Sequence, residues 1–439
     1  MSNKAFYNKA DEVSRRQFML QTARNCLGVS LAPMLGATVA TEAFSAPAPP
    51  LRRRAAKSVI FLNMSGGMSH LDTFDVKPKA KETVRGPVRG INTAADGIQI
   101  SEYLPKTAQI MDRVCLINSM STNQGAHEQG QYILHRSYAP RGTIVHPGIG
   151  SWVLRLGGRR NETIPGYVSI GGSAETASGG FMGAKYSGVP LGNPNEGLKD
   201  SSRAGSVSKE DFEKRLSIAD KMNTKFHGTF GQKQVKSYMG LYEEAVNLMT
   251  SEDLKAFDLG LEDGKVRSMY GDTSFGQGCL LARRLVEHHV RFVEVSLGGW
   301  DTHYDNFASV ESRAAVLDQG FASLVTDLER RGLLDDTLVC IGTEFGRTPD
   351  IVPEHQDGRD HFPRAFSAVM AGGGVKGGTR YGKTDSSAKT VVENKVTPPM
   401  FNATIAYAMG LPLDRVVKSP SGRPFWVSNK EKPVTDIFA

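Results

Sequence analysis

Residues 59–75, VIFLNMSGGMSHLDTFD, join an uninterrupted apolar run to a polar continuation that contains glycine. The run over 59–64 does not alternate with polar residues, which is typical of a strand covered on both faces of a parallel sheet. In open α/β sheets, ligands bind outside the carboxyl ends of the strands. His70 and Asp72, which follow this strand, are therefore candidate metal ligands. Asp75 fits that role and the role of a capping aspartate in a turn equally well.

Five further runs of this kind are spread along the chain. They cover residues 114–118, 167–170, 292–297, 338–343 and 366–370. Between them, apolar residues recur at helix-face spacing from Leu317 to Leu328 and stop before Gly332, and a second helical stretch over 275–289 precedes the strand at 292. This alternation predicts an α/β fold with a largely parallel central sheet covered by helices.

The polar segment after the second apolar run, SMSTNQGAHEQG, offers hydroxyls and a histidine. Ser119, Ser121 and Thr122 are candidate nucleophiles, although hydroxyls are also common helix caps. His127 is a candidate for moving protons or binding metal. His135 lies two turns farther on if this segment is helical, so that it would share the face of His127, or it would be a histidine of the core.

The segment GGWDTHYDNF follows the strand over 292–297 and carries the sharpest local signal. In an extended segment, the side chains at positions i and i+2 point to the same side, so Asp301 and His303 are able to coordinate one metal ion together. The alternative is an aspartate-initiated turn before the next helix.

The last polar segments are TEFGRTP and, a little farther on, GRDHFP. Glu344, Asp360 and His361 add candidate metal ligands. Arg347 and Arg359 present planar cations suited to a phosphate or sulfate group, and surface ion pairs would explain these arginines as well.

Histidines and carboxylates thus follow four different strands, as a hydrolytic centre with one or two divalent ions requires. Zinc, calcium, magnesium and manganese all fit this mixture of nitrogen and oxygen ligands. The glycine-rich stretch over 372–378 lacks the spacing and the lysine of a nucleotide-binding loop.

The N-terminus predicts export. SRRQFM over 14–19 precedes an uncharged apolar stretch over 27–40, which is too short to span a bilayer, and small residues follow. We expect a twin-arginine signal peptide over 1–46, rather than an uncleaved anchor or an ordinary basic helix. The mature protein over 47–439 would be one periplasmic or extracellular domain with an irregular insertion near 171–206 and no permanent membrane span.

Charge and cysteine content set further limits. The formal net charge is +7, but the basic residues are dispersed and no nucleic-acid-binding motif accompanies them. Cys115 and Cys340 lie in strand-like runs and Cys279 in a helical one, so all three are expected to be buried thiols rather than a disulfide framework. A protein that folds in the cytoplasm before twin-arginine export needs no disulfides.

The order of leader, SGGMSHLDTFD, GGWDTHYDNF, TEFGRTP and GRDHFP resembles the domain-of-unknown-function family numbered fifteen hundred and one. That family in turn resembles the alkaline phosphatase and sulfatase superfamily. The resemblance implies a three-layer alkaline-phosphatase-like fold and metal-dependent hydrolysis of anionic phosphate or sulfate esters. The alternative is a non-catalytic extracytoplasmic binding protein with a degenerate centre.

The superfamily pattern carries over residue by residue only in part. Its metal-binding Asp and His pair resembles Asp301 and His303, and its last metal histidine resembles His361. Glu344 stands where an Asp-His dipeptide is usual, and the histidine of that dipeptide is missing. Residues 65–67, SGG, stand where an aspartate normally follows the first strand, so that corner of the site would depend on His70 or Asp72.

Overall fold

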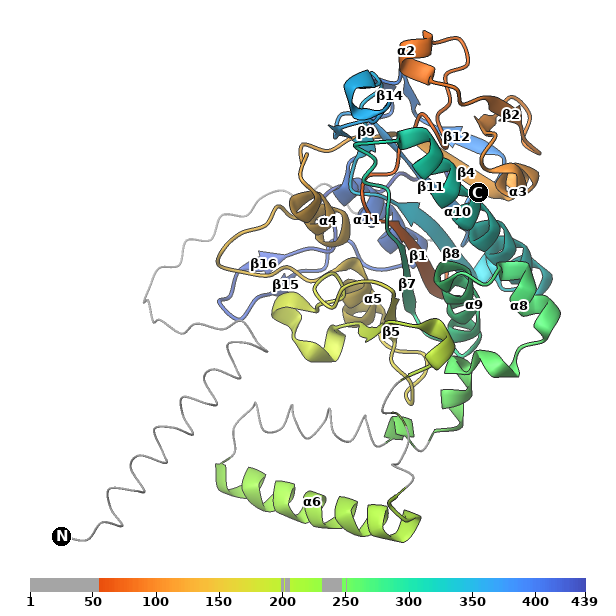
Figure 1. Ribbon diagram of the computed structural model, residues 1–439. Coiled ribbons are helices and arrows are strands. Elements are labelled where there is room, and N and C mark those ends of the chain that lie inside the picture. The colour runs from red at the N-terminus through yellow and green to blue at the C-terminus, as the bar shows by residue number, and fades with distance from the viewer. Residues whose placement is uncertain (1–54, 199–200, 202–205, 231–246, 250) are drawn as a thin grey trace. The chain divides into compact units, whose positions relative to one another are not determined.

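The computed structural model describes residues 55–198, 201, 206–230, 247–249 and 251–439, and the signal peptide expected over 1–46 lies outside them. The described residues contain an eight-stranded sheet of order β12-β4-β11-β8-β1-β7-β5-β6 (Figure 1). Its strands are β1 (Ser58–Met64), β4 (Val114–Met120), β5 (Tyr167–Ile170), β6 (Val189–Leu191), β7 (Phe292–Leu297), β8 (Thr337–Gly342), β11 (Phe366–Gly372) and β12 (Thr379–Tyr381).

The central strand β1 shows why the sheet forms. All of its residues are buried. Because side chains alternate across a strand, Val59 and Phe61 enter one hydrophobic core while Ile60 and Leu62 enter the other. An uninterrupted apolar run is therefore what a strand between two cores requires.

The sheet is largely parallel, as predicted. Strand β1 pairs in parallel with β7 and β8, and β5 continues the parallel order to β6. Strand β11 runs antiparallel to both β8 and β4, whereas β4 and β12 are parallel to each other. The carboxyl ends of β1, β4, β7 and β8 consequently meet at one edge of the sheet.

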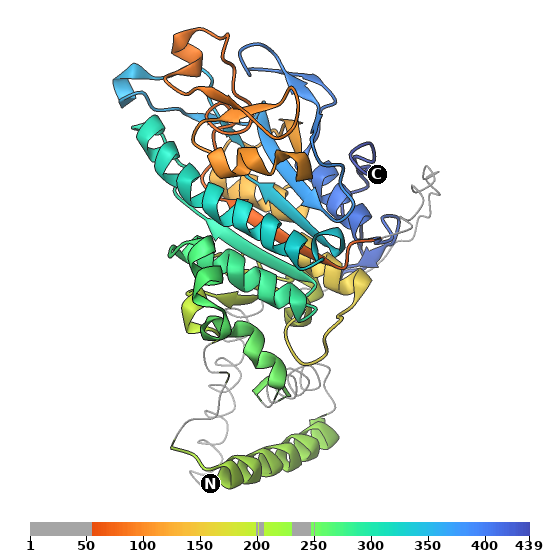
Figure 2. The ribbon, with the colours of Figure 1, turned by 90° about the vertical axis from the view of Figure 1, so that its right-hand side faces the viewer.

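Helices cover both faces and confirm the predicted layered α/β architecture. One core contains side chains from α3 (Pro105–Gln109), α8 (Gly264–Tyr270), α9 (Ser274–Glu287) and α10 (Asn306–Arg330). Figure 2 looks toward this side, where α9 and α10 run next to each other. The other core contains side chains from α4 (His127–Arg136), α5 (Ile149–Gly157) and α11 (Pro398–Ala408).

The two helices predicted from spacing are present. Leu317, Phe321 and Leu324 are buried on α10, which ends two residues before Gly332, a residue of positive φ. The Thr273 side chain accepts a hydrogen bond from the backbone N–H of Gly276 and caps the start of α9.

Among the remaining elements, α6 (Lys209–Phe230) is a helix of 22 residues and α2 (Glu82–Arg85) a single turn. The other strands form two-stranded pairs, and 3-10 turns connect several elements. The pairs are β2 (Gly90–Asn92) with β3 (Gln99–Ser101), β9 (Gly346–Arg347) with β10 (His361–Phe362), β13 (Lys383–Thr384) with β14 (Val391–Glu393), and β15 (Val417–Lys418) with β16 (Pro424–Phe425). The stretch near 171–206, expected to be irregular, contributes the edge strand β6. Strand β6 pairs with β5 through backbone hydrogen bonds. Three residues are too few to show a strand pattern in the sequence, so β6 was not predicted.

Cys115, Cys279 and Cys340 are buried and free, which confirms the expectation for them. Within the described residues, no helix combines the length and the apolar character that a membrane span needs.

Candidate metal centre

Histidines from three loops come together at the carboxyl edge of the sheet. His127 begins α4 after β4, Asp301 and His303 follow β7, and His361 lies on β10. The small β9–β10 pair places His361 opposite Arg347, five residues beyond the end of β8. The fold therefore brings together residues that are more than 200 positions apart in the sequence.

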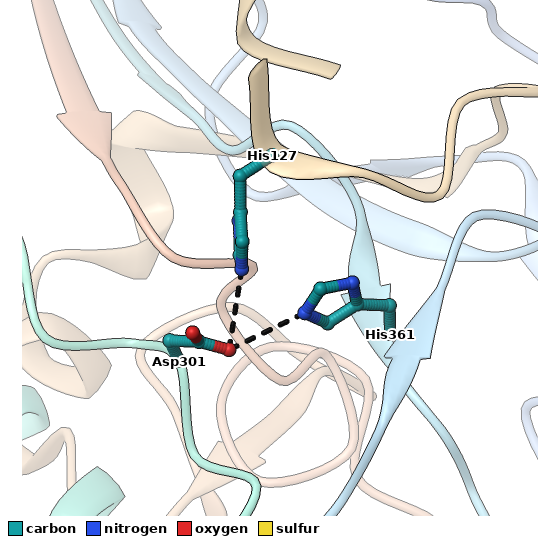
Figure 3. A group of neighbouring side chains, drawn as sticks. All are labelled: His127, Asp301 and His361. Carbon is teal, nitrogen blue, oxygen red and sulfur yellow. Dashed lines mark hydrogen bonds and ion pairs between the residues drawn. The ribbon is translucent and has the colours of Figure 1, made fainter. Parts of the chain in front are cut away.

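The three imidazoles converge on one carboxylate oxygen. Oδ1 of Asp301 lies 3.2 Å from Nε2 of His127, 3.1 Å from Nε2 of His303 and 3.3 Å from Nε2 of His361. The Nε2 atoms of His303 and His361 are 2.9 Å apart. Figure 3 shows His127 and His361 pointing at Asp301 from two sides.

Each of these imidazoles is oriented through its other ring nitrogen. Nδ1 of His127 lies 2.7 Å from Glu344 Oε1, and Nδ1 of His303 lies 2.7 Å from Asp360 Oδ1. Nδ1 of His361 lies 2.8 Å from the backbone oxygen of Gly125. Because a carboxylate or carbonyl oxygen only accepts, each neutral ring donates from Nδ1 and keeps a lone pair on Nε2.

This donor set fits a divalent metal ion. Ligand atoms about 2.0–2.1 Å from a tetrahedral zinc ion are about 3.3 Å from one another. The separations among Asp301 Oδ1 and the imidazole Nε2 atoms, 2.9–3.3 Å where they are in contact, match that figure. His127, Asp301 and His361 also hold one ligand atom each within 4.8 Å of the others. An imidazole Nδ1 bonded to a carboxylate or carbonyl is the usual support of a metal-binding histidine.

One ring nitrogen of His127 lacks a hydrogen-bond partner, as expected of an atom that would bind a metal ion. Its Nε2 is buried and makes no hydrogen bond. The hydrogen bond to Glu344 outweighs partial burial and raises the pKa of His127.

Arg347 is the cation of the centre and is wholly buried. Its Nε donates to Gly67 O at 3.0 Å and its Nη1 to Arg359 O at 3.0 Å, while Nη2 donates to Asp301 and to Gly66 O. Although partial burial opposes ionisation, the Arg347 guanidinium holds the pKa of the Asp301 carboxyl well below its usual range. Arg347 thus ties the loop after β1 to the loop after β7.

The two flanking carboxylates are placed as partners of the histidines. Glu344 is wholly buried and accepts from Gly66 N at 2.9 Å and from Gln131 Nε2 at 2.8 Å, in addition to its contact with His127. Asp360 is half exposed and contacts His303. Both were predicted as direct ligands, and this geometry favours an orienting role for each.

The residues predicted after β1 lie outside this cluster. Asp72 pairs with Arg359 through two contacts, Oδ2 to Nε at 2.9 Å and Oδ1 to Nη2 at 3.1 Å, and accepts from Ser69 and Asn306 as well. Nε2 of His70 lies 3.0 Å from Ala388 O, and burial lowers the pKa of this histidine. Arg359, a candidate for anion binding, is instead paired with the Asp72 carboxylate.

Two of the candidate nucleophiles, Ser119 and Thr122, use their hydroxyls for hydrogen bonds outside the histidine cluster. Ser119 Oγ donates to Asn394 O at 2.7 Å, and Thr122 Oγ1 accepts from Gln124 N at 3.3 Å. Ser121 is buried, and its backbone N–H donates to Val396 O at 2.8 Å. Among the described residues, no hydrogen bond joins these three hydroxyls to the histidine cluster.

Gln131, which no sequence motif singles out, links the cluster to its surroundings. Gln131 lies four residues after His127 on α4, and its Nε2 supports Glu344. Spacing along α4 would have found it, since positions i, i+4 and i+8 share one helix face. His127, Gln131 and His135 occupy these positions, as expected for the two histidines once the segment is helical.

Comparison with known proteins agrees with the sequence resemblance at the level of the family. The family described as "Protein of unknown function (DUF1501)" matches residues 56–438. Among curated proteins, no sequence matches the chain.

Several solved structures are similar to this one at low identity. The lipoteichoic acid synthase LtaP from Listeria monocytogenes is 9% identical, with 82% of this chain and 74% of that chain covered and a TM-score of 0.38. The PsFucS1 sulfatase from Pseudoalteromonas sp. is 13% identical, with 82% and 68% covered and a TM-score of 0.37. A TAB5 alkaline phosphatase mutant with Mg bound in the M3 site is 11% identical, with 83% and 100% covered and a TM-score of 0.38.

Proposed function

The chain belongs to the DUF1501 family, and from that premise we propose that it is a metal-dependent extracytoplasmic hydrolase of phosphate or sulfate esters. The observation that carries the proposal is the convergence of three imidazole Nε2 atoms on Asp301, with each Nδ1 already engaged by an acceptor. The ester class comes from the resemblance of the motifs to the alkaline phosphatase and sulfatase superfamily.

His127, His303, His361 and Asp301 would hold the ion. Three imidazoles and one carboxylate suit zinc, or manganese, better than calcium or magnesium, which prefer oxygen ligands. A divalent ion bound there would supply Lewis-acid charge that activates an attacking hydroxyl or water and stabilises negative charge on the transferred group.

The residues around the ion set the charge of the centre. Asp301, Glu344 and Asp360 carry three negative charges, which a divalent ion and Arg347 together would balance. Positive charge would therefore be concentrated at the ion and at Arg347, where an anionic ester would bind. Glu344 and Asp360 keep the Nδ1 protons of His127 and His303 in place, so that both rings point their lone pairs at the ion.

Metal removal and reconstitution test the first step. The purified mature protein is treated with a chelator, reloaded separately with Zn²⁺, Mn²⁺, Mg²⁺ or Ca²⁺, and its metal content is measured. We expect stoichiometric zinc or manganese and turnover of phosphate or sulfate monoesters that depends on the metal. A protein that binds none of the four ions contradicts the proposal.

The same experiment separates hydrolysis from the alternative function. Bound metal without turnover over a broad panel of phosphate, phosphonate and sulfate esters would support a non-catalytic binding protein instead. Turnover that vanishes with the chelator and returns with the ion excludes that alternative.

Export by the twin-arginine machinery is part of the proposal, with residues 1–46 as the removed signal peptide and 47–439 as one domain. The arginine pair at 15 and 16 and the apolar stretch after it support this route. Changing both arginines to lysine should retain the protein in the cytoplasm, as cell fractionation would show. Export of the altered protein at the normal level would contradict this route.

A further inference from the structure

A cavity of about 370 Å³ lies beside the metal centre, within the range of about 300–1,000 Å³ that is usual for small-molecule sites. Residues at the ends of β1 and β7 and in the loops after β1, β5 and β7 line it together with α4. None of the described residues that line it has an aliphatic or phenylalanine side chain. His127 belongs to the wall of the cavity and to the metal centre, so the two are continuous.

Two polar atoms in the wall lack partners. Asn63 Oδ1 and Ser296 Oγ are buried without a hydrogen bond, and both residues line the cavity. Asn63 is 3% exposed, and its Nδ2 donates to Gln131 Oε1 at 3.3 Å, which fixes the amide with its oxygen as the unused acceptor. Buried polar atoms are rarely left unpaired, so these atoms call for a ligand that donates and accepts hydrogen bonds.

Gly172 lies against the unpaired hydroxyl and leaves no room for a side chain. A Cβ at Gly172 would lie 3.1 Å from Ser296 Oγ and 2.7 Å from Ser169 Oγ, another buried hydroxyl without a partner. The second distance is too short for a real Cβ contact, so the backbone of Gly172 packs directly against these hydroxyls. The wall of the cavity at this point is therefore polar and closely packed.

The buried charged groups of the wall already have partners within the protein. His135 Nδ1 donates to Gln131 O at 2.8 Å, and its Nε2 lies 3.2 Å from the buried Glu294, whose other oxygen accepts from Tyr167 at 3.0 Å. The Arg136 guanidinium donates to backbone oxygens. His135 and Glu294 balance each other, and the Arg136 donors are taken up by backbone oxygens. The unpaired atoms in the buried part of the wall are therefore the uncharged Asn63 Oδ1 and Ser296 Oγ.

The rim of the cavity disfavours a second anion. Glu128 and Glu175 line it and are exposed. Their carboxylates would repel a further phosphate, sulfate or carboxylate group, whereas a neutral hydroxyl accepts or donates hydrogen bonds next to them.

We propose that this cavity binds a neutral, hydroxyl-rich group, a sugar or another polyol, that is esterified to the anionic group held at the metal centre. The inference rests on the proposed function and adds the class of alcohol to it. His127, Gln131 and His135 lie on one face of α4, so that face runs from the metal centre to the buried end of the cavity.

Binding measurements on the metal-loaded protein test the inference. The probes are glucose 6-sulfate and glucose 6-phosphate, compared with phenyl sulfate and phenyl phosphate of equal charge, and methyl glucoside as a free sugar. We expect the sugar esters to bind at least tenfold more tightly than the phenyl esters and the free glucoside to give saturation-transfer signals in NMR.

Two variants remove the unpaired atoms separately. Ser296→Ala and Asn63→Leu should each reduce the preference for sugar esters severalfold without changing metal content. Ser296→Ala removes a single hydroxyl and should leave folding intact. Asn92→Leu, which changes an exposed asparagine on β2, should leave the preference intact.

Equal affinity for sugar and phenyl esters, or a preference that survives both variants, would overturn the inference and assign the unpaired atoms to water. The outcome is independent of turnover. Sugar binding without hydrolysis would support the cavity and contradict the hydrolase proposal, whereas hydrolysis of phenyl esters with no preference for sugars would do the reverse.

Discussion

Asp301 Oδ1 is the single atom on which the centre depends. It is contacted by three imidazoles and by Arg347, which makes it the meeting point of the loops after β4, β7 and β8. Arg347 keeps three backbone acceptors if this carboxylate is changed. Removing the charge of Asp301 should therefore affect ion binding more than folding.

We expect Asp301→Asn and His303→Ala to give folded protein that has lost most of its metal. Each change removes a ligand, so affinity should fall by more than the roughly 10–100-fold that loss of an outer partner costs. Metal analysis after dialysis against a fixed free-ion concentration measures this, with circular dichroism as the check on folding.

Asp305→Asn is the matched control. Asp305 is exposed at the start of α10, has φ of 48° and makes no capping hydrogen bond, and asparagine tolerates that conformation. Metal content close to the parent value is expected. If Asp301→Asn and His303→Ala also retain their metal, the centre is misassigned.

For single residues, the sequence predicted which ones lie near the centre more successfully than it predicted the contacts that each one makes. Asp301, His303, Arg347 and His361 were found because they follow strands. The pairing of Asp72 with Arg359 and the support of His127 by Glu344 join segments more than 200 residues apart, and no local pattern carries that information.

The loop after β1 is the element that shapes the centre, although it supplies no ligand. Gly66 has φ of +117°, and a Cβ there would lie 2.6 Å from the backbone nitrogen of Asp301. The loop after β7 is therefore packed directly against a backbone without a side chain. Gly66 also donates its N–H to Glu344.

Gly66→Ala should weaken both the fold and the metal site. The positive φ alone costs roughly 1–3 kcal/mol for a residue with a side chain, and the close contact must push Asp301 away from the imidazoles. Thermal unfolding and metal titration would record a lower Tm and a lower affinity together.

Gly192→Ala provides the comparison. Nothing lies within 4 Å of a Cβ at Gly192, so stability and metal binding should stay near those of the parent. A Gly66→Ala protein that keeps full metal affinity would show that the two loops are not coupled.

Elements with a strong pattern were predicted closely. The strands over 167–170 and 292–297 agree with β5 and β7 to the residue. Strands β6 and β12 escaped notice because each has three residues and is only partly buried at the edge of the sheet. The sequence predicts helix α4 only conditionally, because its first five residues are polar or glycine and show no apolar periodicity.

The stability of the whole molecule should depend on pH through His146. This histidine is wholly buried, its ring stacks on Tyr138 with centroids 4.5 Å apart, and its Nδ1 accepts from Tyr132 Oη at 2.8 Å. Burial lowers the pKa of His146 to about 4. The folded state therefore holds the neutral ring while the unfolded chain takes up a proton near pH 6.5.

The contribution of His146 to the free energy of unfolding is complete above pH 6.5 and is lost as pH falls from 6.5 toward 4. The loss is at most about 3 kcal/mol. His146→Gln should flatten this part of the stability profile, which urea unfolding at a series of pH values would measure. Parallel profiles for the parent and the variant would rule out His146 as the source.

The rates at which the three buried thiols react with a reagent measure how cooperatively the two layers of the molecule open. Cys279, a residue of α9, lies in the core between the sheet and the helices α9 and α10, whereas Cys115 and Cys340 lie in the core on the opposite face of the sheet. Since burial also raises the pKa of Cys279 and Cys340, a thiol reagent reaches each side only through an opening fluctuation. Equal modification rates would mean that both layers separate from the sheet in one concerted event, and unequal rates would give each layer its own opening free energy.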